Sequence, residues 1–444
     1  MLANSYSTIL RIAVPLMAGT FIQSIVLITD ASFLSRYDIT FFDASGNAGL
    51  FYITLIMGLS GIGDGAQILM ARKIGEKSIG SINKILQSSL IINIILATCF
   101  FVLMTFLAPY IIDKYVLNSE IANGEKLFLS MRSYGFFLAA IIISINSFFM
   151  AMGKTWVILL STLTFALTNI IFDYLLIYGI GPFPELGIQG AALASVLGEL
   201  MSVIVLVTLL LSGKSRKIYH LSHKLQIEIK TFFQVIRIGS PLMLQGFLAL
   251  SSWALFFTWI EQLGQFELTV SQNIRSVYFL AFVPIFGFAA TTKTYVSQYL
   301  GSKKENEIKY VIRKIQLLTI CFLLISFHGA IFYPYQLISW INPSESYITE
   351  SGNILQLVVG SIFIYGLISP FYQTISGSGN TRVTLIIEIF TLLIYLITAY
   401  LFIIHFKLSI LKIWTVEYIY FGTLGLLSIL YLRFFNWKKK LLEP

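Results

Sequence analysis

A few carboxylate and amide side chains lie within long apolar stretches of the sequence, where they could bind a cation. Asp30 lies near the end of the first stretch, and Asn169 precedes Asp173 by one helical turn in the fifth. A carboxylate deep within a bilayer costs several kcal/mol unless it is paired, solvated or protonated. We interpret Asp30, Asn169 and Asp173 as oxygen ligands for a proton or Na⁺. The alternative is that both acids are hydrated at the outer interface.

Gln23 extends this group of polar side chains. It lies seven residues before Asp30 and therefore on the same helical face. We expect the first and fifth helices to present Gln23, Asp30, Asn169 and Asp173 to one cavity in the N-terminal half. Burial and a neighbouring acid both favour the protonated state of a carboxyl group. A proton that reached this cavity would remove a negative charge, weaken the binding of a cationic molecule and let the helices repack.

Other charged residues also fall within the apolar stretches. Asp64 and Lys293 occupy near-equivalent inner positions of the second and eighth stretches, and we hypothesise that they form an ion-pair gate on the cytoplasmic side. The alternative is that water hydrates each of them separately. Four more charged residues are either pairing or interface residues, or substrate contacts: Glu199, Arg275, Glu388 and Glu417. Glu199 is the most central, and we assign it to a substrate cavity.

The composition places these residues in a membrane. Of 444 residues, 57% are hydrophobic and 11% are charged, with a mean hydropathy of +0.83, and no soluble protein of this size needs so apolar a chain. Apolar segments long enough to span a bilayer as helices recur throughout, without the alternation of a membrane barrel. We predict an all-α polytopic membrane protein with about twelve transmembrane helices. Their approximate cores are 9–34, 48–71, 86–112, 128–152, 156–180, 188–211, 234–260, 270–299, 315–341, 353–378, 383–404 and 410–434.

The basic residues predict the orientation of these helices. Of 30 Lys and Arg residues, 22 fall in segments that are cytoplasmic if the N-terminus is cytoplasmic, and only six, including Arg132, fall outside. Both termini are therefore expected in the cytoplasm of a cell with a bacterial-type inner membrane. This distribution explains the net charge of +9 without nucleic acid. Cys99 and Cys321 lie in different predicted spans, and we interpret them as packing residues rather than as a disulfide or metal site.

An internal repeat organises the chain. One constant shift along the sequence, here called the repeat offset, aligns Arg11, Pro15 and Met17 with Arg237, Pro241 and Met243, and it also aligns Gly61 with Gly287 and Gly153 with Gly379. We predict two parallel six-helix lobes, at 1–212 and 234–444, joined by a basic cytoplasmic linker at 213–233. In such transporters the substrate path lies near the membrane midplane, between or within the repeats.

The acids at the Asp30 and Asp173 positions are confined to one copy of this repeat. The repeat offset places Phe256, Tyr395 and Ala399 at the positions of Asp30, Asn169 and Asp173. A duplicated scaffold keeps shared glycines and prolines for packing, so acids present in one copy alone indicate a task of that copy.

Several motifs resemble the multidrug and toxic compound extrusion (MATE) family over nearly the whole chain. They include RIAVPLMAGTFIQSIVLITDASFLSR from Arg11, GLSGIGDGAQILMARKIGEKS from Gly58, FVPIFGFAATTKTYVSQYLGSKK from Phe282 and SGSGNTRVT from Ser376. The resemblance implies an antiporter that exports amphipathic, often cationic organic compounds in exchange for inward H⁺ or Na⁺.

The same resemblance implies roles for individual residues. Asp30, Asn169 and Asp173 match the cation-coupling residues of the family's N-lobe, and Tyr134 and Ser195 resemble its cavity-lining positions. A helix 7 glutamate of many bacterial members is replaced by Ala249, and a helix 10 aspartate is replaced near Pro370. These departures favour coupling through the N-lobe rather than a C-lobe sodium site.

Two other classes of protein fit the sequence less well. A flippase for a lipid-linked precursor would carry a cluster of cavity arginines for a diphosphate, whereas we count only Arg275 and Lys293 as lying in the membrane interior rather than on one of its two sides. An intramembrane enzyme would need a metal-binding aspartate motif or a hydrolase or P-loop motif, none of which is present. We expect a transporter rather than an enzyme, and no organic cofactor. We also expect the protein to bind small organic cations, to contact membrane lipids and to act as a monomer.

Overall fold

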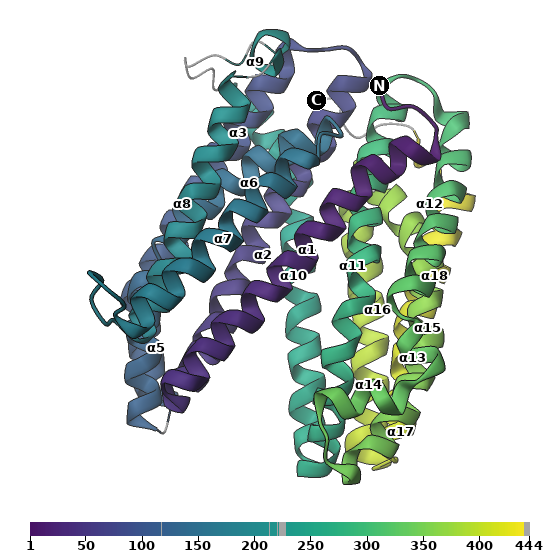
Figure 1. Cartoon of the computed structure of the whole chain (residues 1–444). Coiled ribbons are helices and arrows are strands. Elements are labelled where there is room, and N and C mark those ends of the chain that lie inside the picture. The colour runs from purple at the N-terminus through teal and green to yellow at the C-terminus, as the bar shows by residue number, and fades with distance from the viewer. Residues whose placement is uncertain (117, 213, 220, 222–227, 439–444) are drawn as a thin grey trace. The chain divides into compact units, whose positions relative to one another are not determined.

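The computed structural model describes residues 1–444 except 117, 213, 220, 222–227 and 439–444. Within these described residues the regular secondary structure is entirely helical (Figure 1). The first half of the chain forms α1 (Tyr6–Tyr37), α2 (Ile39–Gly75), α3 (Gly80–Val102), the π-helical turn η1 (Leu103–Leu107), α4 (Ala108–Tyr115), α5 (Ser119–Arg132), α6 (Gly135–Ala151), α7 (Trp156–Tyr178), α8 (Ile188–Ser212) and α9 (Lys214–Ile218). The predicted linker 213–233 lies partly outside the described residues.

The second half of the chain is also a series of helices joined by short connections. It forms α10 (Ile229–Glu261), α11 (Gln265–Gly301), α12 (Glu305–Ser326), α13 (His328–Phe332), α14 (Pro334–Ile341), α15 (Glu345–Gly377), α16 (Thr381–Tyr400), the π-helical turn η2 (Leu401–His405), α17 (Ile410–Ile413) and α18 (Val416–Phe434). Each of the twelve predicted span cores overlaps at least one of these helices.

The apolar helices confirm the prediction of an all-α membrane protein. Among the described residues, nine helices are long and apolar enough to cross a bilayer, and eleven are if each of two bent helix pairs forms one span. One bent pair is α5 with α6, which meet at 50° next to Arg132. The predicted span 315–341 is not in this set, and it is divided among α12, α13 and α14. The count of twelve therefore stays a prediction.

The contacts divide the chain into two compact units. Val14–Met243 form the first, here called the N-terminal unit, and Met1–Ala13 with the chain from Leu244 onward form the second, here called the C-terminal unit. The boundaries fall inside α1 and α10, near Pro15 and Pro241, which lie within those helices.

Glycines bring two helix backbones together within the N-terminal unit. A Cβ atom at Gly61 of α2 would lie 2.3 Å from the backbone nitrogen of Met243 in α10, and one at Gly65 would lie 2.7 Å from Cα of Gly239. Lipid gives helices no hydrophobic reason to associate, so small residues four apart allow the close van der Waals contact that holds them. Gly61 and Gly65, which lie in the sequence motif that begins at Gly58, therefore have a packing role.

Aromatic contacts fix α1 against α7 in the same unit. The Tyr178 hydroxyl donates a hydrogen bond of 2.9 Å to the carbonyl oxygen of Phe33. The Phe33 ring also contacts the rings of Tyr174 and Tyr178, with centroids 6.1 and 6.2 Å apart. Gly179 then ends α7 in the left-handed conformation, with φ of 64°. These contacts lie next to Asp30 and Asp173 in sequence and hold the two helices together there.

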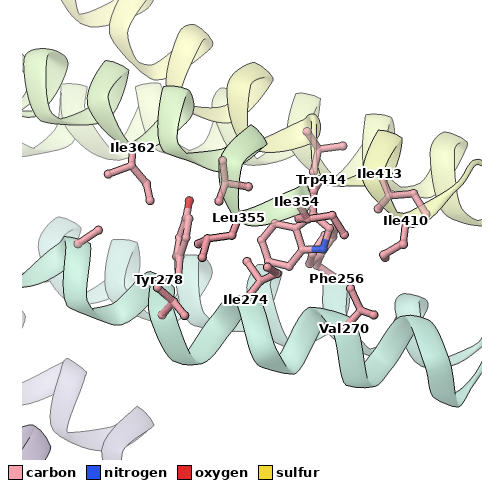
Figure 2. Close-up of a cluster of buried hydrophobic side chains, with 14 of the residues drawn as sticks. Phe256, Val270, Ile274, Tyr278, Ile354, Leu355, Ile362, Ile410, Ile413 and Trp414 are labelled. Carbon is pink, nitrogen blue, oxygen red and sulfur yellow. The ribbon is translucent and has the colours of Figure 1, made fainter. Parts of the chain in front are cut away.

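The C-terminal unit has a large aromatic core. The rings of Phe256, on α10, and Trp414 meet there (Figure 2), with centroids 5.6 Å apart. The ring of Tyr395, on α16, lies 5.8 Å from that of Phe256. The indole nitrogen of Trp414 donates to the hydroxyl of Ser271 at 3.2 Å, which satisfies the one polar atom of this buried ring.

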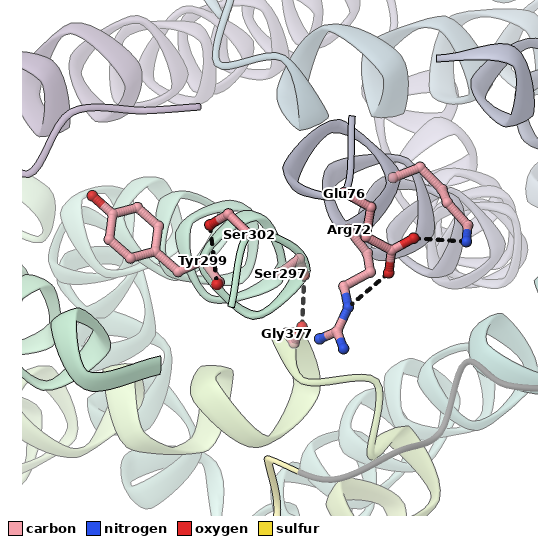
Figure 3. Close-up of polar contacts among 7 residues, drawn as sticks. Arg72, Glu76, Ser297, Tyr299, Ser302 and Gly377 are labelled. Atoms are coloured by element: carbon pink, nitrogen blue, oxygen red, sulfur yellow. Dashed lines mark hydrogen bonds and ion pairs between the residues drawn. The ribbon is translucent and has the colours of Figure 1, made fainter. Parts of the chain in front are cut away.

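A second contact in the C-terminal unit joins α11 to α15. The Ser297 hydroxyl of α11 donates a hydrogen bond of 2.6 Å to the carbonyl oxygen of Gly377, the last residue of α15 (Figure 3). A Cβ atom at Gly377 would lie 2.9 Å from the carbonyl oxygen of Lys293. The glycine therefore lets the two helices approach at this end.

Cys99 and Cys321 are free and exposed. Their interpretation as packing residues is wrong, because both lie on the outer faces of apolar helices, where a thiol behaves as a small apolar group.

Candidate cation-coupling site

Two acids from different helices meet inside the N-terminal unit. The carboxyl groups of Asp30, on α1, and Asp173, on α7, lie close enough to interact with each other. Asp173 is fully buried, and Asp30 is partly buried. The structure thus brings together two side chains that lie far apart in the sequence. We call Asp30 and Asp173 the acid pair.

Several oxygens at this place have no donor. Oδ1 of Asp30, both carboxylate oxygens of Asp173 and Oδ1 of Asn169 are buried without a hydrogen-bond partner among the described residues. Buried acceptors are normally satisfied, so such a group requires an explanation. A proton shared between the two carboxyl groups, or a cation bound by these oxygens, would satisfy them.

Asn169 connects the acid pair to α8. Asn169 is one turn before Asp173 on α7 and fully buried, and its Nδ2 donates a hydrogen bond of 3.3 Å to the Ser195 hydroxyl. The amide nitrogen is thereby held by α8, which leaves its oxygen available as a ligand. Carboxylate, amide and hydroxyl oxygens are suitable ligands for a hard cation, so these four residues fit either H⁺ or Na⁺ chemically.

Arg132, which the sequence places outside the membrane, forms a buried ion pair in the N-terminal unit. Nη2 of Arg132, at the end of α5, donates to Oε1 of Glu199 on α8 at 2.7 Å, with side-chain exposures of only 12% and 11%. The guanidinium group also lies over the ring of Tyr52 on α2, 3.9 Å from its centroid, and the Tyr52 hydroxyl approaches Glu199 at 3.4 Å. We call Arg132, Glu199 and Tyr52 the arginine cluster.

The arginine cluster interacts electrostatically with the acid pair. The positive charge of Arg132 acts on the carboxyl group of Asp30. Nη1 of Arg132 and Oε2 of Glu199 are both buried without a hydrogen-bond partner in the same part of the chain. The guanidinium group therefore has a donor without a partner, and Glu199 in the same cluster has an acceptor without one.

Gly135 makes room for the arginine cluster. A Cβ atom there would lie 2.3 Å from Nη1 of Arg132, 2.6 Å from Oε2 of Glu199 and 2.7 Å from the Tyr52 hydroxyl. The bend between α5 and α6 falls here. Arg132 is the last residue of α5, and Gly135, the first residue of α6, leaves room for its side chain.

The remaining sequence candidates lie elsewhere. Gln23 is exposed on α1, and Tyr134 is 55% exposed with its ring 5.2 Å from that of Phe101. Asp64 is partly buried on α2 in the N-terminal unit, and Lys293 is buried on α11 in the C-terminal unit. The gate between Asp64 and Lys293 stays a prediction, as do the cavity roles of Gln23 and Tyr134.

The second repeat lacks the acid pair at the equivalent positions, as the sequence predicted. Phe256, Tyr395 and Ala399 are all buried in the aromatic core of the C-terminal unit. Ring packing thus replaces the carboxyl groups in this copy.

Comparisons with known proteins agree with the repeat. The MatE family model matches residues 15–175 and 241–401. The repeat offset that aligns Pro15 with Pro241 carries the first and last residues of the first match onto those of the second. The chain is 24% identical over 434 residues to the probable multidrug resistance protein NorM of Thermotoga maritima, covering 95% of this chain and 91% of that protein. It is 23% identical to the protein of the same name from Synechocystis, covering 85% and 83% of the two chains.

Solved structures share the fold. An outward-facing multidrug resistance MATE family transporter of the MOP superfamily aligns with a TM-score of 0.86 at 19% identity, covering 98% of this chain and 97% of that one. A MOP superfamily transporter from Pyrococcus furiosus aligns with a TM-score of 0.84 at 19% identity, covering 98% of this chain and 97% of that one. The reverse polarity of its binding pocket is described as suggesting a different function. The fold alone therefore does not fix the substrate. The family model nevertheless matches both halves of the chain, and the protein belongs to the MatE family of transporters.

Proposed function

We propose that the protein is a secondary antiporter that exports amphipathic, often cationic organic compounds in exchange for inward H⁺ or Na⁺. The relatives named as probable multidrug resistance proteins support this class of substrate, and the family membership supports transport. The single observation that carries the coupling part is the acid pair, whose buried oxygens lack any donor within the described residues.

In the proposed cycle the acid pair exchanges one positive charge for another. With its proton or Na⁺ removed, the pair carries negative charge in a site of low dielectric, where a cationic substrate is attracted strongly. Arrival of H⁺ or Na⁺ from outside neutralises that charge and releases the substrate. Electroneutral exchange avoids the cost of an uncompensated charge inside the membrane.

Arg132 provides a way to transmit the change. When the acid pair is neutral, Arg132 remains paired with Glu199 at 2.7 Å. When the pair is charged, Asp30 competes for the same guanidinium group, whose Nη1 has no hydrogen-bond partner within the described chain. The resulting movement would act on α5 and α8, the helices that carry Arg132 and Glu199.

We place the protein in the inner (plasma) membrane with both termini cytoplasmic, on the distribution of basic residues. The lipid-precursor flippase is the weaker candidate. The arginine cluster holds one arginine that is already paired with a carboxylate, whereas a diphosphate calls for several available basic groups.

The experiment is efflux of ethidium from cells expressing the protein, with an imposed proton gradient or an imposed sodium gradient. We expect efflux to follow one gradient, and Asp30→Asn and Asp173→Asn each to abolish it. Asp113→Asn, on a 59% exposed side chain paired with Lys126, is the control that should keep full activity. Efflux that persists in both acid-pair variants would reject the coupling site, and lack of any cation export would reject the substrate class.

A further inference from the structure

The C-terminal unit contains a buried carboxylate that the acid pair does not explain. Glu417, near the start of α18, is 3% exposed. The Tyr278 hydroxyl of α11 donates to its Oε2 at 2.6 Å, and the Tyr395 hydroxyl of α16 lies 3.5 Å from its Oε1. One oxygen is therefore firmly held, and the other has only a weak contact.

A second glutamate in the same unit provides a useful contrast. Glu388 of α16 is 4% exposed, and its two oxygens accept hydrogen bonds from Tyr420 at 2.6 Å and Tyr372 at 2.9 Å. Gln245 donates to the Tyr372 hydroxyl, so the hydrogen of Tyr372 stays directed at Glu388. Two short donors suit a carboxylate and leave no oxygen open.

The two glutamates belong to one array of tyrosines. The rings of Tyr395 and Tyr420 lie 5.5 Å apart, and they connect the partner of Glu417 with a partner of Glu388. The nearby titratable and charged side chains on the elements that pack around Glu417 are Tyr278 and Arg275 of α11, Tyr365 of α15, Tyr395 and Glu388 of α16, and Tyr420 of α18. Arg275 itself lies over the ring of Phe257, 5.2 Å from its centroid.

Glu417 has no basic partner within the described part of the chain. A permanently charged carboxylate without a counterion would be costly in this apolar core. Na⁺ would need several oxygen lone pairs, whereas the Tyr278 hydroxyl presents its hydrogen to the carboxylate. A proton needs one open oxygen, and Oε1 provides it.

The internal repeat supports a functional role for this place in the fold. The repeat offset relates Tyr278 to Tyr52 and Tyr395 to Asn169. In the N-terminal unit Tyr52 contacts Glu199 and Asn169 contacts Ser195, both on α8. In the C-terminal unit both equivalents contact the single carboxylate of Glu417 on α18.

We propose that Glu417 is a second proton-binding site of the transporter, separate from the acid pair. A proton from water forms an O–H bond at Oε1, Tyr278 keeps Oε2 in place, and Tyr395 turns its own hydrogen away to accept the new one. Release reverses these steps. The use of this proton in transport rests on the proposed function, but its binding does not.

The test measures protonation directly rather than transport. Difference infrared spectra of the purified full-length protein, recorded on stepping from acid to alkaline pH, detect the carbonyl stretch of a protonated carboxyl group. We expect one pH-sensitive band that disappears in Glu417→Gln and shifts in Tyr395→Phe, because that variant loses the partner of Oε1. The same band should persist in Glu388→Gln, in exposed Glu345→Gln and in a double Asp30→Asn, Asp173→Asn variant.

Three results would overturn the proposal. They are a spectrum unchanged by Glu417→Gln, a Glu417 band that does not respond to pH, and a band that disappears with Glu388 instead. If Glu417→Gln does not fold, Tyr395→Phe decides the question through the frequency shift. The acid-pair variant keeps this result distinct from failure of the proposed function.

Discussion

The ion pair between Arg132 and Glu199 should contribute strongly to the stability of the N-terminal unit. Its atoms lie 2.7 Å apart and its side chains are 12% and 11% exposed, so removing one partner leaves a buried charge uncompensated. Such a loss costs about 3–5 kcal/mol. We expect Glu199→Gln and Arg132→Met each to lower the free energy of unfolding by that amount, measured by denaturation of the purified protein in detergent.

The double replacement Arg132→Met with Glu199→Leu tests the cause. Apolar residues of similar volume often replace a buried ion pair at little cost, so we expect the double variant to recover most of the lost stability. A matched control is the pair of Lys126 and Asp113, 2.6 Å apart but 32% and 59% exposed, whose neutralisation should cost less than about 1 kcal/mol. Single variants no less stable than this control, or losses that simply add, would refute the reasoning.

Three further predictions concern packing and pH. Gly135→Ala should lower stability by about 1–3 kcal/mol, because its Cβ would lie 2.3–2.7 Å from all three members of the arginine cluster, whereas Gly46→Ala has nothing within 4 Å and should be neutral in the same thermal assay. Gly61→Ala should reduce stability more, with its Cβ 2.3 Å from the α10 backbone; an unchanged unfolding temperature would contradict this close contact. The hydrogen bond from Lys84 lowers the pKa of the exposed Glu228 in the folded protein. Glu228 therefore stabilises the fold at pH values above its pKa in the unfolded chain, and this stabilisation is lost as the pH falls through its pKa in the folded protein. Glu228→Gln should remove this part of the pH dependence of the unfolding temperature.

The sequence predicted the features that depend on pattern. Apolar length predicted the membrane helices, and the repeat offset predicted the two matches of the family model. The sequence also predicted that the first and fifth helices present Asp30 and Asp173 to one cavity, because acids are rare enough in apolar spans for their positions to be informative; the coupling role of this cavity stays a prediction. Their wide separation in the sequence did not matter, since helices of equal depth can meet regardless of distance along the chain.

The arginine cluster could not be predicted in the same way. Arg132 lies at a helix end, where counting rules treat a basic residue as exposed. Its burial depends on the 50° bend between α5 and α6 and on the space left by Gly135. The available signal was a glycine shortly after a lone arginine in an apolar region, which is too common to interpret alone.

The side chains that contact Glu417 could not be predicted from the sequence either. Its type and place in an apolar span marked it as a candidate, but its partners come from α11 and α16. Tyrosines are frequent in this chain, with 23 in all, so composition does not identify the two that contact a carboxylate. Only the packing of three helices selects them.

The most direct test of the central claim is the release of the coupling ion when substrate binds. Purified protein in weakly buffered solution, preloaded with H⁺ or with radioactive Na⁺, is mixed with ethidium, and the ions released per bound ethidium are counted. The acid-pair account predicts about one ion released from the wild type and none from Asp30→Asn or Asp173→Asn, with Asp113→Asn unchanged. Equal release from the acid-pair variants and the wild type would contradict it.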